Sequence, residues 1–185
     1  LKKLKSTGKI DNLILQNKNY GKGFAIKTAL EKCSGDIIII QDADLEYDPN
    51  DYYKLLKPFK NKNISVVYGS RVLGRRKRLF EFTLVKQFRI FGNFILTKIS
   101  NIINNQNLSD AHTCYKVIKT STFKKLKIKE NDFSFCPEVT TKLSNLGIKI
   151  HEVPISYKGR DYKDGKKIGL KDAFFAIRTI LKYKS

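Results

Sequence analysis

The chain has 185 residues, 41% of them hydrophobic, and its nine tyrosines and twelve phenylalanines are sufficient for the core of one compact α/β domain. No apolar run approaches the roughly 20 residues of a membrane-spanning helix and no secretory signal opens the chain, so a cytoplasmic protein is expected. Three widely spaced cysteines argue against both a disulfide framework and a zinc knuckle.

The net charge of +20, from 37 Lys and Arg against 17 acids, predicts a polyanionic partner. Nucleic acid, anionic lipid headgroups and a phosphorylated substrate all meet this condition, and a biased genomic base composition also enriches lysine. The one local basic cluster, Arg75-Arg76-Lys77-Arg78, lies in no recognised nucleic-acid-binding motif. No specific nucleic acid is therefore expected as a partner.

The beginning of the chain predicts a short helix end, a strand and a second helix. Residues 1–8 are typical of a helix closed by Gly8, and 10–16 of a short strand. A polar loop then leads into a helix over 24–33. The turn Gly21-Lys22-Gly23 before this helix offers backbone N–H groups and one cation to an anion such as a nucleotide diphosphate, but an ordinary turn with a solvated lysine fits equally well.

The run of four isoleucines at 37–40 predicts a strand covered on both faces, and Asp42 and Asp44 follow at its carboxyl end. Ligands bind beyond the carboxyl ends of strands in open α/β sheets, and an extended backbone aims both acids to one side. Two carboxylates suit Mg²⁺, which completes its coordination with water and phosphate oxygens. The alternative is a solvated loop, since Asp48-Pro49-Asn50 is turn chemistry.

The next segments repeat the pattern of a buried strand followed by a polar turn. A helix is expected over 49–60, and a strand over 64–68 leads into Gly69-Ser70-Arg71. Arg71 should therefore lie at the same edge of the sheet as the two aspartates, where it could clamp a phosphate or pair with a nearby acid. A basic loop over 73–82 then precedes a long helix over 84–103 with a wide apolar stripe.

The last third of the chain predicts an extended segment over 110–117 headed by Asp110, a helix over 133–146 and a strand over 148–154. A polar loop over 156–167 contains Arg160. In the final helix, three cations lie outside an apolar stripe, which is typical of core packing or of a membrane-surface helix. The stripe contains Ala173, Phe174, Ile177, Ile180 and Leu181, and the cations are Lys171, Arg178 and Lys182.

Five of these segments, in this order, resemble the family 2 glycosyltransferases, most closely the polyprenyl-phosphate sugar transferases of the dolichyl-phosphate mannose synthase-like group. The resemblance covers nearly the whole chain. The segments are Gly21-Lys22-Gly23, Gln41 to Pro49, Tyr68 to Arg71, Asp110 to Val117, and Glu152 to Tyr157 with Arg160 and Gly165 to Ile168.

The resemblance implies an α/β fold of the GT-A type with a mixed, mostly parallel sheet. It places Asp42 and Asp44 on the family's Asp-x-Asp positions as catalytic and metal-binding residues for Mg²⁺ or Mn²⁺, with Asp42 also contacting the donor's sugar or ribose and Glu46 nearby. Lys22 falls near the nucleotide. The other residues expected in catalysis are Arg71 and Arg160, which match phosphate-holding positions, Asp110, and on a looser alignment Arg89.

The chain also departs from the family pattern. Nothing before Ile10 supplies the opening strands that grip base and ribose in similar enzymes, so residues 1–185 are interpreted as a single domain that lacks its first strands. His112 and Cys136 stand where acids are common in similar chains.

The resemblance implies an inverting transfer of sugar from a nucleotide-diphosphate sugar to a polyprenyl phosphate, by a protein lying peripherally on the anionic, cytoplasmic face of a membrane. A phosphate acceptor is already anionic and needs no strong base. If the acceptor were instead a sugar hydroxyl in cell-wall or surface polysaccharide synthesis, Asp110 or Glu138 would be the candidate base.

Two other classes compete with the transferase. Phosphatases of the haloacid dehalogenase type also carry Asp-x-Asp after a strand, but Leu45-Glu46-Tyr47 does not supply the Thr or Val that they place next. A non-catalytic basic module that binds nucleic acid or membrane is the second alternative.

Overall fold

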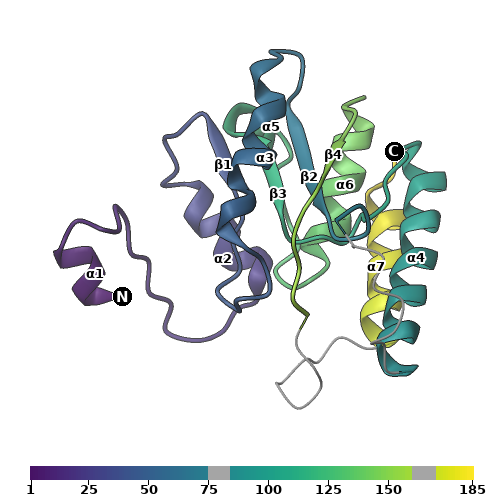
Figure 1. The fold of residues 1–185 in the computed structure, drawn as a ribbon, viewed down its shortest axis with the longest axis horizontal. Helices are drawn as coiled ribbons and strands as arrows, with labels where there is room; N and C mark the ends of the chain where they lie inside the picture. The colour runs from purple at the N-terminus through teal and green to yellow at the C-terminus, as the bar shows by residue number, and fades with distance from the viewer. Residues whose placement is uncertain (75–83, 160–169) are drawn as a thin grey trace.

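The computed structural model describes residues 1–74, 84–159 and 170–185, with the backbone alone for 84–89 and 170. Within this part of the chain, four strands form one mixed sheet in the order β1-β3-β2-β4 (Figure 1). β3 runs antiparallel to both of its neighbours and β4 runs parallel to β2, so three strands point the same way. The strands are β1 (Ile37–Ile39), β2 (Val66–Ser70), β3 (Lys116–Lys119) and β4 (His151–Pro154).

Helices cover both faces of the sheet. α2, α5 and α6 lie on one face and α3 on the other, while α4 and α7 pack together beyond β4 (Figure 1). α1 stands apart and buries no residue. The α-helices are α1 (Lys2–Ser6), α2 (Lys22–Leu30), α3 (Tyr52–Leu56), α4 (Leu84–Asn104), α5 (Thr120–Lys125), α6 (Phe135–Asn145) and α7 (Leu170–Tyr183), and the 3₁₀-helices are η1 (Pro49–Asp51) and η2 (Lys57–Lys60).

The core follows the two-residue period of the strands. Ile38, Val66 and Ile118 face α6, whereas Val67 and Val117 face α3. All four of these β2 and β3 side chains are fully buried, and each such burial contributes roughly 1.5–3 kcal/mol. The prediction that the isoleucine run forms a strand packed on both faces is confirmed.

The topology brings separate polar segments to one edge of the sheet. β1, β2 and β4 all end at this edge, and β3 begins there because it runs in the opposite direction. We call it the carboxyl edge. The residues that follow β1 and β2 therefore meet the residues that precede β3, although more than 35 residues of chain separate Arg71 from Asp110.

Three predictions of secondary structure were wrong in part. Residues 10–16 form no strand, and no described strand lies beside them to supply hydrogen bonds. The expected helix over 49–60 is broken into η1, α3 and η2, with Pro58 in the last. The extended segment over 110–117 is a turn as far as Tyr115, because the buried Lys116 ammonium donates to the carbonyls of Ala111 and Thr113.

Candidate functional site

The loop after β1 carries the two aspartates to the carboxyl edge, where both are half-buried. Asp44 accepts the Glu46 amide at 3.1 Å, which makes a tight turn between them. Leu45 sits inside that turn with a φ of 62° and 90% of its surface exposed. A branched apolar side chain seldom adopts a positive φ or lies in water, so this loop is held in a costly conformation.

Lys22 reaches Asp42 from the start of α2. Its ammonium lies 2.6 and 2.7 Å from the two carboxylate oxygens, and the lysine side chain is 13% exposed. Burial alone lowers the pKa of a lysine, but the surrounding Cys114, Cys136 and Asp42 raise the pKa of Lys22 above its ordinary value. The lysine is therefore a charged partner of the first aspartate and not the solvated lysine of an ordinary turn.

Gly21 and Gly23 are required by packing. A Cβ on Gly21 would lie 2.4 Å from the Asn131 carbonyl oxygen, and one on Gly23 would lie 2.4 Å from that of Glu130. The Phe24 amide, in the first turn of α2, donates to the Asn131 carbonyl at 3.0 Å. This end of the helix packs on protein, so the structure gives no support to the first of the two interpretations of this turn, a cradle of backbone amides for a nucleotide phosphate.

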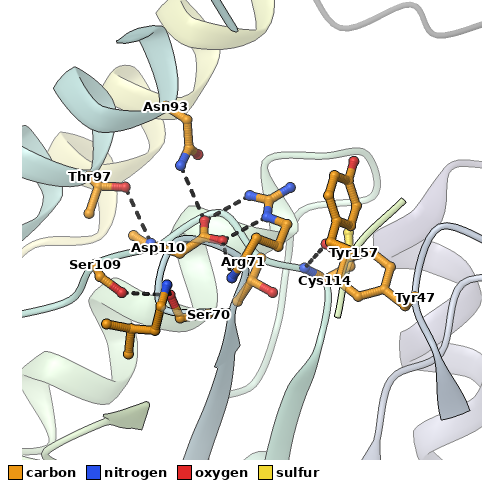
Figure 2. Close-up of polar contacts among 12 residues, drawn as sticks. Tyr47, Ser70, Arg71, Asn93, Thr97, Ser109, Asp110, Cys114 and Tyr157 are labelled. Atoms are coloured by element: carbon orange, nitrogen blue, oxygen red, sulfur yellow. Dashed lines mark hydrogen bonds and ion pairs between the residues drawn. The ribbon is translucent and has the colours of Figure 1, made fainter. Parts of the chain in front are cut away.

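Arg71 and Asp110 form a bidentate ion pair at the same edge (Figure 2). The Arg71 Nε and Nη2 atoms donate to the carboxylate at 2.6 and 2.7 Å, and the Arg71 backbone amide adds a third bond at 3.1 Å. Asp110 is fully buried, whereas the arginine side chain keeps 20% of its surface exposed. The guanidinium carbon also lies 5.3 Å from the centre of the Tyr157 ring.

Further hydrogen bonds hold Asp110 in place. The amides of Ser109 and Asp110 both donate to the Glu152 carboxylate of β4, at 2.7 and 3.0 Å, and Asn93 of α4 donates to Asp110 at 3.3 Å. Burial alone would raise the pKa of Asp110, but the Arg71 charge and the hydrogen bonds from Arg71 and Asn93 hold that pKa below its usual value. Asp110 is thus an anion at neutral pH, and it orients Arg71.

Glu46 lies on the inner side of its loop and is buried. Its carboxylate accepts the Tyr157 hydroxyl at 2.8 Å, and the next residue, Tyr47, accepts the Cys114 amide at 3.0 Å (Figure 2). These bonds join the Asp42–Asp44 loop to the segments before β3 and after β4. Glu46 therefore braces the loop in this structure.

Some candidate residues stand apart from this arrangement. Glu138 is fully buried, and its oxygens accept two backbone amides and the Lys142 ammonium. Such a carboxylate is not placed to act as a base on a sugar hydroxyl. Cys136 is buried in the core and His112 has an unpaired, buried Nε2 atom, with burial lowering its pKa to about 4. Arg160 lies outside the described residues, as does the side chain of Arg89.

A metal site and a membrane-spanning helix each have structural requirements. Among the described residues, no cluster of three or more His, Cys, Asp or Glu side chains could hold a metal ion alone. Asp42 and Asp44 nevertheless offer hard oxygen donors of the kind that Mg²⁺ and Mn²⁺ take in pairs when phosphate and water complete the shell. In the described part of the chain, no helix combines the length and apolarity needed to cross a bilayer.

A family model described as "Glycosyl transferase family 2" matches residues 1–127. Relatives include the low-salt glycan biosynthesis hexosyltransferase Agl6 of Haloferax volcanii, 26% identical over 80% of this chain and 35% of its own length. The UDP-N-acetylglucosamine–dolichyl-phosphate N-acetylglucosaminyltransferase of Methanococcus voltae is 25% identical over 92% of this chain and 68% of its length. The dolichyl-phosphate β-glucosyltransferase ALG5A of Trichomonas vaginalis is 25% identical, over 86% and 50% respectively.

Solved structures share the fold. Glucosyl-3-phosphoglycerate synthase from Mycobacterium tuberculosis, with Mn²⁺ and UDP-glucose, has a TM-score of 0.59 at 13% identity and covers 93% of this chain. The same enzyme with Mg²⁺ and UDP gives a TM-score of 0.58 at 15% identity. This chain covers 55% and 56% of those two structures, so it spans about half of their length. The expected GT-A-like α/β architecture is confirmed.

Proposed function

The chain belongs to glycosyl transferase family 2, and we propose that it transfers a sugar from a nucleotide-diphosphate sugar to a polyprenyl phosphate at the cytoplasmic face of an anionic membrane. One observation carries the proposal: Asp42 and Asp44 lie at the carboxyl edge together with Arg71. Acids that can share a cation with a diphosphate thus stand at the same edge as a guanidinium that can meet a second phosphate.

The donor would be held through the Asp42–Asp44 loop. Asp44 and Asp42 would bind Mg²⁺ or Mn²⁺, with Asp42 kept in position by Lys22 and turned toward the sugar or ribose. The metal, when bound, neutralises charge on the departing diphosphate. The Mycobacterium tuberculosis structures named for Mn²⁺ with UDP-glucose and Mg²⁺ with UDP support a donor and cation of this kind.

The environment of the buried acids favours a phosphate acceptor. Asp110 and Glu138 are both fully buried and occupied by cations and amides, so neither is available to deprotonate a sugar hydroxyl. A lipid phosphate attacks without a base: its oxygen bonds to the anomeric carbon while the bond from that carbon to the nucleotide diphosphate breaks. The dolichyl-phosphate enzymes of Methanococcus voltae and Trichomonas vaginalis support the same choice.

Labelled sugar should appear in a lipid product. We expect protein from the complete reading frame to transfer label from a nucleotide sugar to polyprenyl phosphate in the presence of Mn²⁺, and the Asp44→Ala variant to transfer none. Chromatography of the organic and aqueous phases measures both products. Label found only on free sugars would overturn the lipid acceptor and favour the polysaccharide alternative.

Helix α4 supports the membrane location because its amphipathicity is reversed. Its buried positions are polar, with Thr97, Ser100 and Asn104 turned inward. Its exposed face is apolar except for Lys98 and follows helical spacing, with Phe91 60%, Phe94 53%, Ile95 42% and Ile102 82% exposed. An apolar stripe left in water marks a surface that is covered in use.

Helix α7 packs beside α4 and extends this character (Figure 1). Phe174 and Leu181 are 67% and 61% exposed, which differs from the core role also considered for them, and Arg178 lies between them on the same face. Exposed aromatic side chains beside cations are typical of helices that lie in the interface of an anionic bilayer. We define the docking face as Phe91, Phe94, Ile95, Ile102, Phe174 and Leu181.

Binding to vesicles should depend on this docking face. Phe174→Glu replaces an exposed apolar side chain, proposed to enter the bilayer, by a charge that anionic lipid repels, and affinity for phosphatidylserine vesicles should fall about tenfold or more. Tyr53→Glu is the matched control, because Tyr53 is 73% exposed on α3 and lies outside the docking face. Equal loss in both variants, measured by sedimentation with vesicles, would show that net charge alone drives binding.

A further inference from the structure

The loop formed by residues 129–132 is fixed by the buried Glu138 carboxylate. The amides of Lys129 and Glu130 donate to its two oxygens at 2.7 and 2.8 Å. Lys142 neutralises the carboxylate at 2.6 Å and also donates to the Lys127 carbonyl at 2.8 Å. A fully buried charge with this many partners defines the backbone that it binds, since any shift leaves it unpaired.

The same loop is the seat of α2. Besides the glycine contacts and the Phe24 amide described above, the Lys27 ammonium donates to the Lys129 carbonyl at 2.8 Å and to the Asn131 side chain at 2.5 Å. The first turn of α2 therefore lies flat on the 129–132 loop. Lys22 projects from this turn to Asp42, 20 residues further along the chain.

A third helix holds the loop from outside. The Glu130 carboxylate accepts the Lys182 ammonium and the Tyr183 hydroxyl of α7, both at 2.7 Å. Glu138 of α6 thus binds the backbone of the loop, and α7 binds the Glu130 side chain. The carbonyl oxygens of the loop face the glycines at the start of α2. Its position decides where the Lys22 ammonium can reach.

We propose that Glu138 is a positioning residue for the donor site: by fixing the 129–132 loop, it seats the first turn of α2 and so holds the Lys22 ammonium on Asp42. These contacts are independent of any activity. Only the role of the Lys22–Asp42 pair in donor binding rests on the proposed function. Glu138 is too deeply buried to touch substrate, so its influence passes through Lys22.

The reactivity of Lys22 toward an amine acylating reagent, measured by mass spectrometry, tests this directly. In Glu138→Gln, one of the two amides loses its carboxylate acceptor, and in Gly23→Ala the new Cβ pushes the turn off the loop. We expect Lys22 to acylate about threefold faster in either variant, in keeping with a loosened, partly buried ion pair. Gly92→Ala is the matched control, because a Cβ there meets nothing within 4 Å.

Lys116 reports on the fold in the same experiment, because it is fully buried and should stay unreactive in every variant used. If Lys116 becomes reactive in Glu138→Gln, the variant Lys27→Met is used in its place. Lys27 is half-buried and binds the same 129–132 loop. Unchanged Lys22 reactivity with Lys116 protected overturns the inference. Faster Lys22 labelling with unaltered Mn²⁺-dependent binding of nucleotide diphosphates supports the positioning role and counts against the pair's part in donor binding.

Discussion

Asp44→Ala should strongly weaken the Mn²⁺-dependent binding of nucleotide diphosphate. The remaining carboxylate, Asp42, is bound at both oxygens by Lys22, so the variant keeps only one of the two proposed metal ligands, and that one is shared with an ammonium group. We expect affinity to fall on the order of a hundredfold. Mutation of a residue that only hydrogen-bonds to a metal ligand costs up to about this much, and Asp44 is itself a proposed ligand. Calorimetric titrations with UDP, GDP and ADP, each with and without Mn²⁺, measure the loss.

Asp48→Asn is the matched control for this experiment. Asp48 is an exposed acid of the same loop, and its Oδ1 atom accepts the Asn50 amide at 3.0 Å, a bond that asparagine keeps. Its affinity for nucleotide should stay within about twofold of wild type, as expected for a surface change. Equal binding by wild type and Asp44→Ala would remove the Asp-x-Asp loop from the donor site and leave only a basic binding module.

Asp110→Asn should cost about 3 kcal/mol of unfolding free energy. Removing one charge from a buried pair leaves the other uncompensated, and the cost lies at the lower end of the usual 3–5 kcal/mol because Arg71 is 20% exposed. Urea unfolding at pH 7 measures the change. Lys54→Met, which breaks a pair whose lysine is 54% exposed, should cost less than about 1 kcal/mol. Similar costs for the two variants would mean that the Arg71–Asp110 pair does not stabilise the edge.

The pH dependence of this pair has a defined sign. The folded protein holds the pKa of Asp110 below its ordinary value, so the unfolded chain binds more protons in acid. The stabilisation is fully present above about pH 4, the value for an unperturbed aspartate, and is lost as the pH falls through the lower folded pKa. The difference in stability between wild type and Asp110→Asn should therefore shrink below about pH 4.

Elements with strong local signals were predicted well. The isoleucine run became β1, and the helices expected over 84–103 and 133–146 are α4 and α6 within two residues at each end. The rule that strands end at a common edge also placed Arg71 correctly at the same edge of the sheet as the aspartate loop. These features depend on hydrophobic periodicity and on turn residues, and both signals can be read from a short stretch of sequence.

The pairings across the site could not be predicted in the same way. Arg71 finds Asp110, and Lys22 finds Asp42, only once the sheet has brought distant segments together. The turn before β3 appeared extended because the signal that bends it is an internal lysine capping two carbonyls. Glu152 belongs to one of the family-like segments, but nothing in the sequence indicates that its carboxylate accepts the Ser109 and Asp110 amides. Arg160 lies outside the described residues and stays a prediction.

The position of β3 between β1 and β2 also determines when the molecule can assemble. β1 and β2 do not touch each other in the sheet; each pairs with β3, which follows them by 46 residues or more. A ribosome releases the chain from its amino end, so both earlier strands must wait, with exposed edges, until Lys116–Lys119 has emerged. Such long-range closure is slow, and the high density of like charges along the chain helps to keep the waiting segments from aggregating.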